Sequence, residues 1–115
     1  MEPAVKSIVT EYTEISAFSQ NPKECEHHLI FGTGLRKLAD EDGIWIPLTH
    51  NEHNTGELKT RIHDNPAAEK LSKIAGQLAY EKNYYREMLE HAGELEEDED
   101  PARDIFRRRY GMSYL

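Results

Sequence analysis

The spacing of apolar residues along the chain predicts one long helix. Between residues 66 and 90, apolar side chains recur with a period near 3.6, which is typical of an amphipathic helix. Asn65 can cap the first turn, and Pro66 suits the first helical position because the N–H that proline lacks would have no partner there. We therefore expect a helix over residues 66–90. Its apolar stripe comprises Leu71, Ile74, Ala75, Leu78, Tyr85 and Leu89.

Two shorter apolar runs before this helix are typical of β-strands. Residues 25–31 end in a glycine-rich turn, and residues 44–48 follow the pair Asp42-Gly43. Pro47 lies inside the second run, and it is excluded from a central position in a sheet because it has no N–H to donate. We expect the two strands to pair as a hairpin whose loop is long and irregular.

The remaining segments carry shorter patterns. Residues 5–18 have helix-compatible apolar spacing, although their β-branched members would also suit a strand, and we interpret them as a helix. The pair Asn21-Pro22 then marks a break. Residues 50–57 are expected to form one or two helical turns that end near Gly56. Asp100-Pro101 repeats the cap-and-proline signal, so a second, short helix is expected from there to Gly111.

These elements predict an α+β fold, in which a small β-hairpin plus a helix is braced by a long helix and a short C-terminal helix. The 115 residues lie in the range of one domain. We divide the chain into an N-terminal segment (1–22), a region that holds the hairpin and the long helix (23–93), an acidic linker (94–100) and a C-terminal docking helix (101–115).

Charge and cysteine content narrow the classes of function. The net charge of −8 argues against a strong general attraction to nucleic acid, but six acidic residues lie within 94–100, so the rest of the chain is near neutral. The single cysteine, Cys25, excludes an internal disulfide and a Cys-x-x-Cys zinc site. No signal segment or membrane-spanning run is visible, so we expect a cytoplasmic protein that contacts no membrane.

Five of the six histidines lie within one third of the chain: His27, His28, His50, His53 and His63. Imidazole is the commonest protein ligand for transition metals, and it can act as a base near neutral pH. Neighbouring side chains on a strand point to opposite faces, so His27 and His28 can divide these two roles. A hairpin that folds back would bring His53 towards His27, and His63 could supply another ligand. We interpret His50 as a surface residue.

Three segments place these histidines in a recognisable order. They are Glu26-His27-His28-Leu29-Ile30-Phe31-Gly32, then Ile46-Pro47-Leu48-Thr49 leading to Glu52-His53, and then Ile62-His63-Asp64-Asn65-Pro66. The arrangement resembles the small phage-type HNH endonucleases, which carry a ββα-metal site. The tail from Ile105 to Leu115 is also similar to the closing segment of that group, so the resemblance extends from roughly residue 24 to the C-terminus.

The resemblance implies roles for individual positions. His27 matches the first metal-ligand position, and His28 matches the general base. His53 matches the later histidine ligand, while His63 matches a recurrent histidine that serves either as a ligand or as a phosphate contact. Arg36 or Lys37 could hold a neighbouring phosphate. Region 23–93 is then an HNH-like ββα-metal domain.

The chemistry that the resemblance implies is divalent-metal-dependent hydrolysis of DNA phosphodiester bonds, in phage or prophage DNA processing. His28 would take a proton from water, and the ion would neutralise charge on the phosphate and the leaving oxygen. A site rich in imidazole suits Zn²⁺, Ni²⁺ or Mn²⁺ better than Mg²⁺, which prefers oxygen ligands. Glu57, one helical turn after His53, could add an oxygen ligand.

One position differs from the family's pattern. The middle asparagine, expected shortly before the second strand, has no counterpart in Glu41-Asp42-Gly43-Ile44, where Asp42 could substitute in holding the loop. Two alternatives follow. The first is a metal-stabilised module that associates with DNA or binds a protein without cleaving. The second is a helical interaction protein without metal, which forms a homodimer through the long helix.

Overall fold

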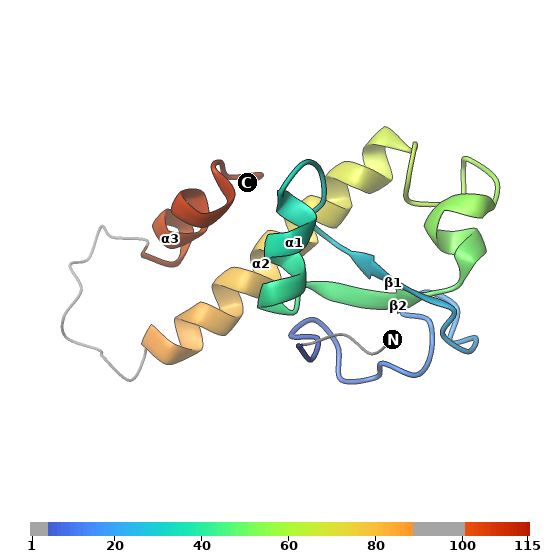
Figure 1. Ribbon diagram of the computed structural model, residues 1–115, viewed down its shortest axis with the longest axis horizontal. Helices are drawn as coiled ribbons and strands as arrows, with labels where there is room; N and C mark the ends of the chain where they lie inside the picture. The colour runs from blue at the N-terminus through green and yellow to red at the C-terminus, as the bar shows by residue number, and fades with distance from the viewer. Residues whose placement is uncertain (1–4, 89–100) are drawn as a thin grey trace.

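The computed structural model describes residues 5–88 and 101–115. The acidic linker and the last residues of the expected long helix lie outside this part. The elements, in chain order, are β1 (Cys25–His28), α1 (Leu35–Asp42), β2 (Trp45–Leu48), the π-helix η1 (Asn51–Thr55), α2 (Pro66–Met88) and α3 (Pro101–Tyr110) (Figure 1). The predicted α+β fold is confirmed. No helix among the described residues is long and apolar enough to span a membrane.

The two strands form the predicted antiparallel hairpin. Cys25 pairs with Leu48, and His28 pairs with Trp45 at the other end of the register. Pro47 is tolerated in β2 because a two-stranded sheet leaves one side of each strand free of ladder bonds. All four residues of β2 are buried, so this strand lies within the core.

The connection between the strands is α1, not the irregular loop that we expected. Leu35 and Leu38 pack against the core and Ala39 is fully buried, so a short amphipathic helix covers the hairpin. Gly34 (φ 79°) and Gly43 (φ 71°) flank α1 in the left-handed region, and the N–H of Gly43 closes its last turn. The two glycines therefore set the ends of α1. The helix was not predicted because it is short and mostly polar.

The helix predicted for the N-terminal segment is wrong. Residues 5–24 instead run along the hairpin in turns. The Ser7 hydroxyl donates to the carbonyl oxygen of Trp45 and also accepts from the N–H of Val9. Ser16 accepts in the same way from the N–H of Phe18. Such local side-chain bonds compete with helical hydrogen bonds, and they fix the segment as irregular chain.

Helix α2 begins where the sequence predicts, because Pro66 is its first residue and Asn65 Oδ1 accepts from the N–H of Ala68 at 3.3 Å. Its orientation differs from the prediction. Leu71 and Leu78 of the apolar stripe are 65% and 51% exposed. The helix instead turns its small and polar side towards the hairpin.

Gly76 is the physical reason for this orientation. A Cβ atom at Gly76 would lie 2.8 Å from a methylene carbon of Ile30 and 3.0 Å from atoms of Ile44 and Leu29. Only glycine permits α2 to approach the hairpin so closely, and this contact outweighs burial of the leucines. Ser72 is buried on the same side of the helix, where its hydroxyl donates to the carbonyl oxygen of Leu29.

Helix α3 completes the core through stacked aromatic rings. Phe106 is fully buried and lies 4.6 Å from Tyr110 and 5.5 Å from Tyr80, between ring centroids. Arg109 binds the carboxylate of Asp42 at the end of α1, and the hydroxyl of Tyr110 donates to the same carboxylate at 2.7 Å. Asp42, which we expected to hold the loop, therefore anchors α3.

Replacing Phe106 with alanine is expected to lower the free energy of unfolding by about 3–5 kcal/mol, because it leaves a cavity beneath α3. Urea denaturation followed by circular dichroism measures this change. Tyr12→Ala, at a highly exposed ring, is the control and should change stability by no more than about 0.5 kcal/mol. Equal stability of Phe106→Ala and the wild type would show that α3 does not dock as described.

Candidate metal centre

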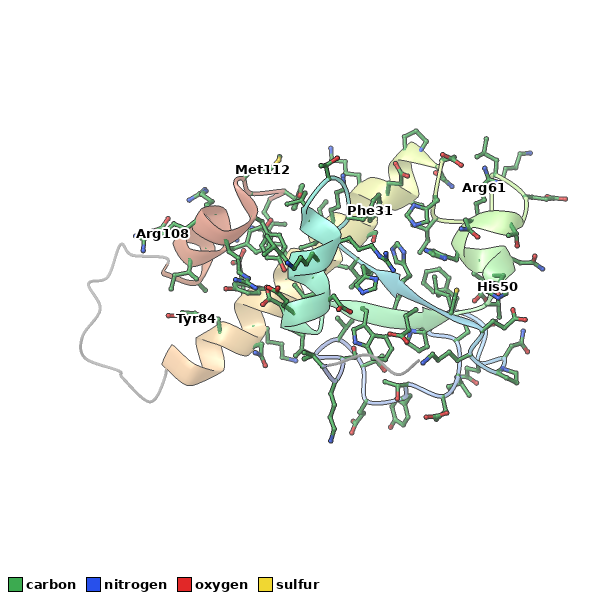
Figure 2. The ribbon with its side chains drawn as sticks, in the orientation of Figure 1. Phe31, His50, Arg61, Tyr84, Arg108 and Met112 are labelled. Carbon is green, nitrogen blue, oxygen red and sulfur yellow. The ribbon has the colours of Figure 1, made fainter. Side chains whose placement is uncertain are left out.

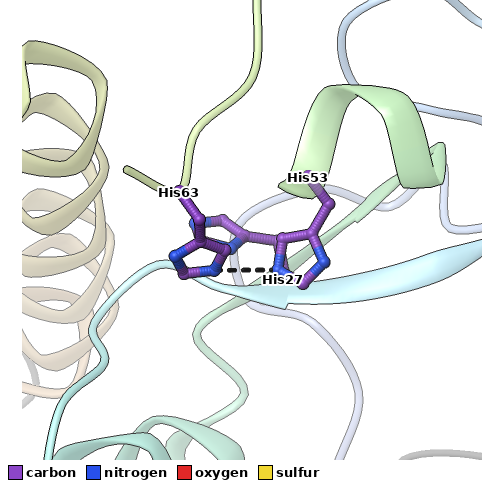
Figure 3. Close-up of side chains that lie close together, drawn as sticks. All are labelled: His27, His53 and His63. Atoms are coloured by element: carbon purple, nitrogen blue, oxygen red, sulfur yellow. Dashed lines mark hydrogen bonds between the residues drawn. The ribbon is translucent and has the colours of Figure 1, made fainter. Parts of the chain in front are cut away.

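Three imidazole rings from separate segments meet beside α2. His27 is in β1, His53 is in η1, and His63 lies in the loop before α2 (Figure 3). Each offers a ligand atom, and these atoms all lie within 4.8 Å of one another, so the three residues could hold a metal ion. The structure thus brings together the three histidines that the sequence singled out as ligands.

Local backbone bonds set His53 beside His63. The N–H of His63 donates to the carbonyl oxygen of His53 at 3.0 Å, and the N–H of Ile62 donates to that of Glu52 at 2.9 Å. Arg61 braces the intervening loop, because its guanidinium donates to the carbonyl oxygens of His63 and Gly56. These bonds therefore hold His53 and His63 next to each other before α2 begins.

The π-helix η1 sets the direction of His53. The N–H of Gly56 donates to the carbonyl oxygen of Asn51, and a Cβ at Gly56 would lie 2.5 Å from that oxygen. π-helical turns are uncommon, and they occur frequently at functional sites. The short helical turn that we expected over residues 50–57 is confirmed, with Gly56 at its end.

His27 presents one free nitrogen to the cluster. Its Nε2 lies 2.8 Å from Ser72 Oγ, and the Ser72 hydroxyl donates its own hydrogen to the carbonyl oxygen of Leu29. Ser72 Oγ must therefore accept from Nε2–H, which leaves a lone pair on Nδ1. That Nδ1 is buried and has no hydrogen-bond partner among the described residues. A buried nitrogen of this kind is costly unless another group, such as a cation, binds it.

The outer nitrogens of the other two rings have longer contacts. His63 Nδ1 lies 3.6 Å from Glu69 Oε2, and His53 Nδ1 lies 3.6 Å from Cys25 Sγ. Their Nε2 atoms face each other at 2.9 Å. Two lone pairs at that distance repel unless a proton or a cation lies between them. Ligating histidines usually direct the outer nitrogen to a neighbouring acceptor, which fixes the ring orientation.

Burial keeps two of the rings neutral. It lowers the pKa of His27 to about 3, with further lowering from His53 and His63. Burial is also the largest cause that lowers the pKa of His53, to about 4. Both imidazoles are therefore unprotonated at neutral pH, which is the state that binds a metal.

Phe31 shields the cluster on one side. Its ring centroid lies 4.7 Å from that of His63 and 5.7 Å from that of His27, and the ammonium group of Lys73 lies over the ring at 4.8 Å from the centroid. An apolar shell of this kind limits solvent access and lowers the local dielectric constant around a metal. Phe31 is marked in Figure 2.

His28 lies in a neighbouring cavity of about 290 Å³. The cavity is lined by His28, Gly34, Arg36, Lys37 and Asp40. The imidazole is only 8% exposed, and its Nε2 lies 3.0 Å from Asp40 Oδ1. The two cations that we expected to hold a phosphate thus border the same cavity as the expected base.

The cavity and the histidine cluster are linked through β1. His28, which lines the cavity, directly follows His27 of the cluster in this strand. Neighbouring side chains of a strand point to opposite faces, so the two residues serve different sites from one element.

Other sequence candidates lie apart from the cluster. His50 is exposed next to η1, as predicted (Figure 2). Among the described residues, it is not part of the group that could hold a metal. Glu57 is exposed and is likewise not part of that group. Sequence reasoning missed Ser72, Glu69 and Asp40. Glu69 and Ser72 are three residues apart and lie opposite the apolar stripe, and this spacing could have indicated the first two.

Comparisons of the chain with protein-family models, with curated proteins and with solved structures find no match.

Replacing Ser72 with alanine is expected to weaken metal binding about 10- to 100-fold, because the outer nitrogen of His27 loses its acceptor and the ring loses its fixed orientation. Competition with a chromophoric chelator measures the affinity. Ser19→Ala, at an exposed serine in the N-terminal segment, is the matched control and should bind as the wild type does. Unchanged affinity in Ser72→Ala would remove this serine from the centre.

Proposed function

We propose that the protein is a divalent-metal-dependent endonuclease of the HNH type that hydrolyses DNA phosphodiester bonds. One observation carries the proposal. Three histidines bring one ligand atom each to within 4.8 Å of one another, and their outer nitrogens lie next to Ser72, Cys25 and Glu69. The resemblance of the sequence motifs to phage-type HNH endonucleases supports the same function, in the processing of phage or prophage DNA.

His27, His53 and His63 would hold the ion. When bound, a divalent ion stabilises negative charge on a phosphate oxygen and on a leaving oxygen. Three imidazole nitrogens favour Zn²⁺, Ni²⁺ or Mn²⁺ over Mg²⁺, because Mg²⁺ prefers oxygen ligands. Activity should therefore be tested first with these three metals.

Side chains in the neighbouring cavity would transfer the proton and bind the phosphate. His28 takes a proton from the attacking water, which adds to the phosphorus in line with the leaving oxygen. Arg36 and Lys37 border the same cavity and bind the phosphate by charge. Low solvent exposure of His28 keeps other water away from the base. These roles require the phosphate to occupy the cavity of about 290 Å³.

A second function is a metal-stabilised module that binds DNA or a protein without cleaving. Two observations favour it. No asparagine lies between the two strands, whereas the family pattern has one there. Leu71 and Leu78 also leave an apolar stripe exposed along α2, which a protein partner could cover. A homodimer through α2 would use the same stripe.

Plasmid nicking separates the two functions. Supercoiled plasmid is incubated with the protein and Mn²⁺, Ni²⁺, Zn²⁺ or Mg²⁺, and the conversion to nicked and linear forms is followed on a gel. The proposed nuclease nicks the plasmid with at least one metal and stops when EDTA is added. Retention of one bound ion without nicking under any of these conditions would favour the binding module.

A further inference from the structure

The buried side chain of His28 has one hydrogen-bond partner among the described residues. Its Nε2 lies 3.0 Å from Asp40 Oδ1, and no bond from Nδ1 is formed within that part of the chain. An ionised carboxylate can only accept, so Nε2 must carry the hydrogen. The lone pair is then on Nδ1, where it can accept a proton.

Asp40 differs from the two acidic residues that follow it, because both of those bind residues of α3. Asp42 binds Arg109 and Tyr110, and Glu41 also binds Arg109. Arg36 and Lys37 border the same cavity, but within the described residues neither forms an ion pair with Asp40. Of the three acidic residues at the end of α1, Asp40 alone reaches His28.

The element that carries Asp40 is fixed at its end and along its inner face. Gly43 donates to the carbonyl oxygens of Ala39 and Asp40, and Ala39 is fully buried against the core. The bonds from α3 to Asp42 hold the C-terminal end of α1. An acceptor on a rigid element orients its partner more accurately than one on a loop does.

From these contacts we propose that Asp40 is the positioning residue of the reaction. It fixes His28 in the tautomer and orientation that direct Nδ1 to water, which is the task left open by the missing asparagine. The proposal rests on the proposed nuclease function. Asp40 also lines the cavity that the phosphate would occupy, but its carboxylate would repel a phosphate, so its contribution to the reaction is made through His28.

Kinetics of Asp40 variants test this role. Asp40→Ala should lower kcat about 10- to 100-fold with little change in KM, because the base is present but misoriented. Asp40→Asn should recover part of kcat, since its amide oxygen can accept the same hydrogen bond. Asp104→Ala, at an exposed acid on α3, is the control and should behave as the wild type does. Wild-type kcat in Asp40→Ala would overturn the proposal.

A double-mutant cycle separates positioning from a structural effect. If Asp40 acts through His28, adding Asp40→Ala to His28→Ala should cause no further loss of kcat. A further 10- to 100-fold loss in the double variant would show that Asp40 acts elsewhere, and would overturn the proposal. Urea denaturation and metal content of each variant confirm that the comparison is made between folded, loaded proteins.

The tautomer of His28 can be read without any activity. Long-range ¹H–¹⁵N NMR spectra of the wild type should show hydrogen on Nε2 of His28, and this preference should disappear in Asp40→Ala. Hydrogen on Nδ1 in the wild type would overturn the proposal. A wild-type protein that binds metal but nicks no plasmid would instead refute the nuclease function, so the two failures are distinguishable.

Discussion

His28→Ala is expected to lower the rate of DNA cleavage about 10²- to 10⁴-fold while the metal stays bound, which is the usual contribution of a general base. His28 faces a cavity with Arg36 and Lys37, whereas the three ligand histidines meet in a separate cluster. Loss of the base should therefore leave metal binding and folding intact. The measurement is plasmid nicking under single-turnover conditions, with metal content determined in parallel.

The matched control is His50→Ala. His50 is an exposed histidine and, among the described residues, it is not one of the three clustered histidines. It should nick at the rate of the wild type. Cleavage by His28→Ala at the rate of His50→Ala would show that another group activates the water. Exogenous imidazole, which can take the place of the missing ring, should partly restore activity to His28→Ala.

His63→Ala is expected to abolish the stabilisation that metal gives to the fold. An ion at a concentration 100 times its dissociation constant adds about 2.7 kcal/mol to the free energy of unfolding. His63 supplies one of three imidazoles and is partly exposed, so its removal weakens binding without opening the core. Urea denaturation of wild type and variant, with and without Zn²⁺, measures the difference.

A control distinguishes loss of a ligand from loss of the fold. Without metal, His63→Ala and the wild type should unfold within about 1 kcal/mol of each other, the effect typical of a single substitution. His50→Ala should keep the whole stabilisation by Zn²⁺. If Zn²⁺ stabilised His63→Ala as much as the wild type, the ion would bind somewhere else.

The sequence predicted the elements that carry strong local signals. Asn65 and Pro66 define the start of α2, and two short apolar runs next to turn residues define the hairpin. Helix α1 escaped prediction because its eight residues are mostly charged and its ends are set by Gly34 and Gly43. The helix predicted for the N-terminal segment was wrong because Ser7 binds the backbone of the hairpin, a contact that no local pattern reveals.

The ligands of the candidate centre were predictable, but the residues that orient them were not. His27, His53 and His63 could be chosen by residue type and order along the chain. Ser72 depends on which side of α2 faces the hairpin. The apolar stripe predicted the opposite side, because periodicity cannot weigh the close approach that Gly76 permits.

Asp40 escaped prediction for a related reason. It lies on α1, a helix that the sequence pattern did not predict, so nothing placed its carboxylate beside His28. Asp42 was the acid chosen for the task, and the structure uses it to bind α3. Tertiary contacts between short elements decide such pairings, and a single sequence carries no local signal for them.

Anomalous diffraction from crystals grown with Zn²⁺ or Mn²⁺ would test most directly whether the three imidazoles share one ion. We expect a single strong peak bound by Nδ1 of His27 and by Nε2 of His53 and His63, with metal–nitrogen distances of about 2.0–2.1 Å for Zn²⁺. The peak should adjoin the cavity of His28. A cluster without a peak at saturating metal, or a peak held by other residues, would contradict the proposed centre and the nuclease function built on it.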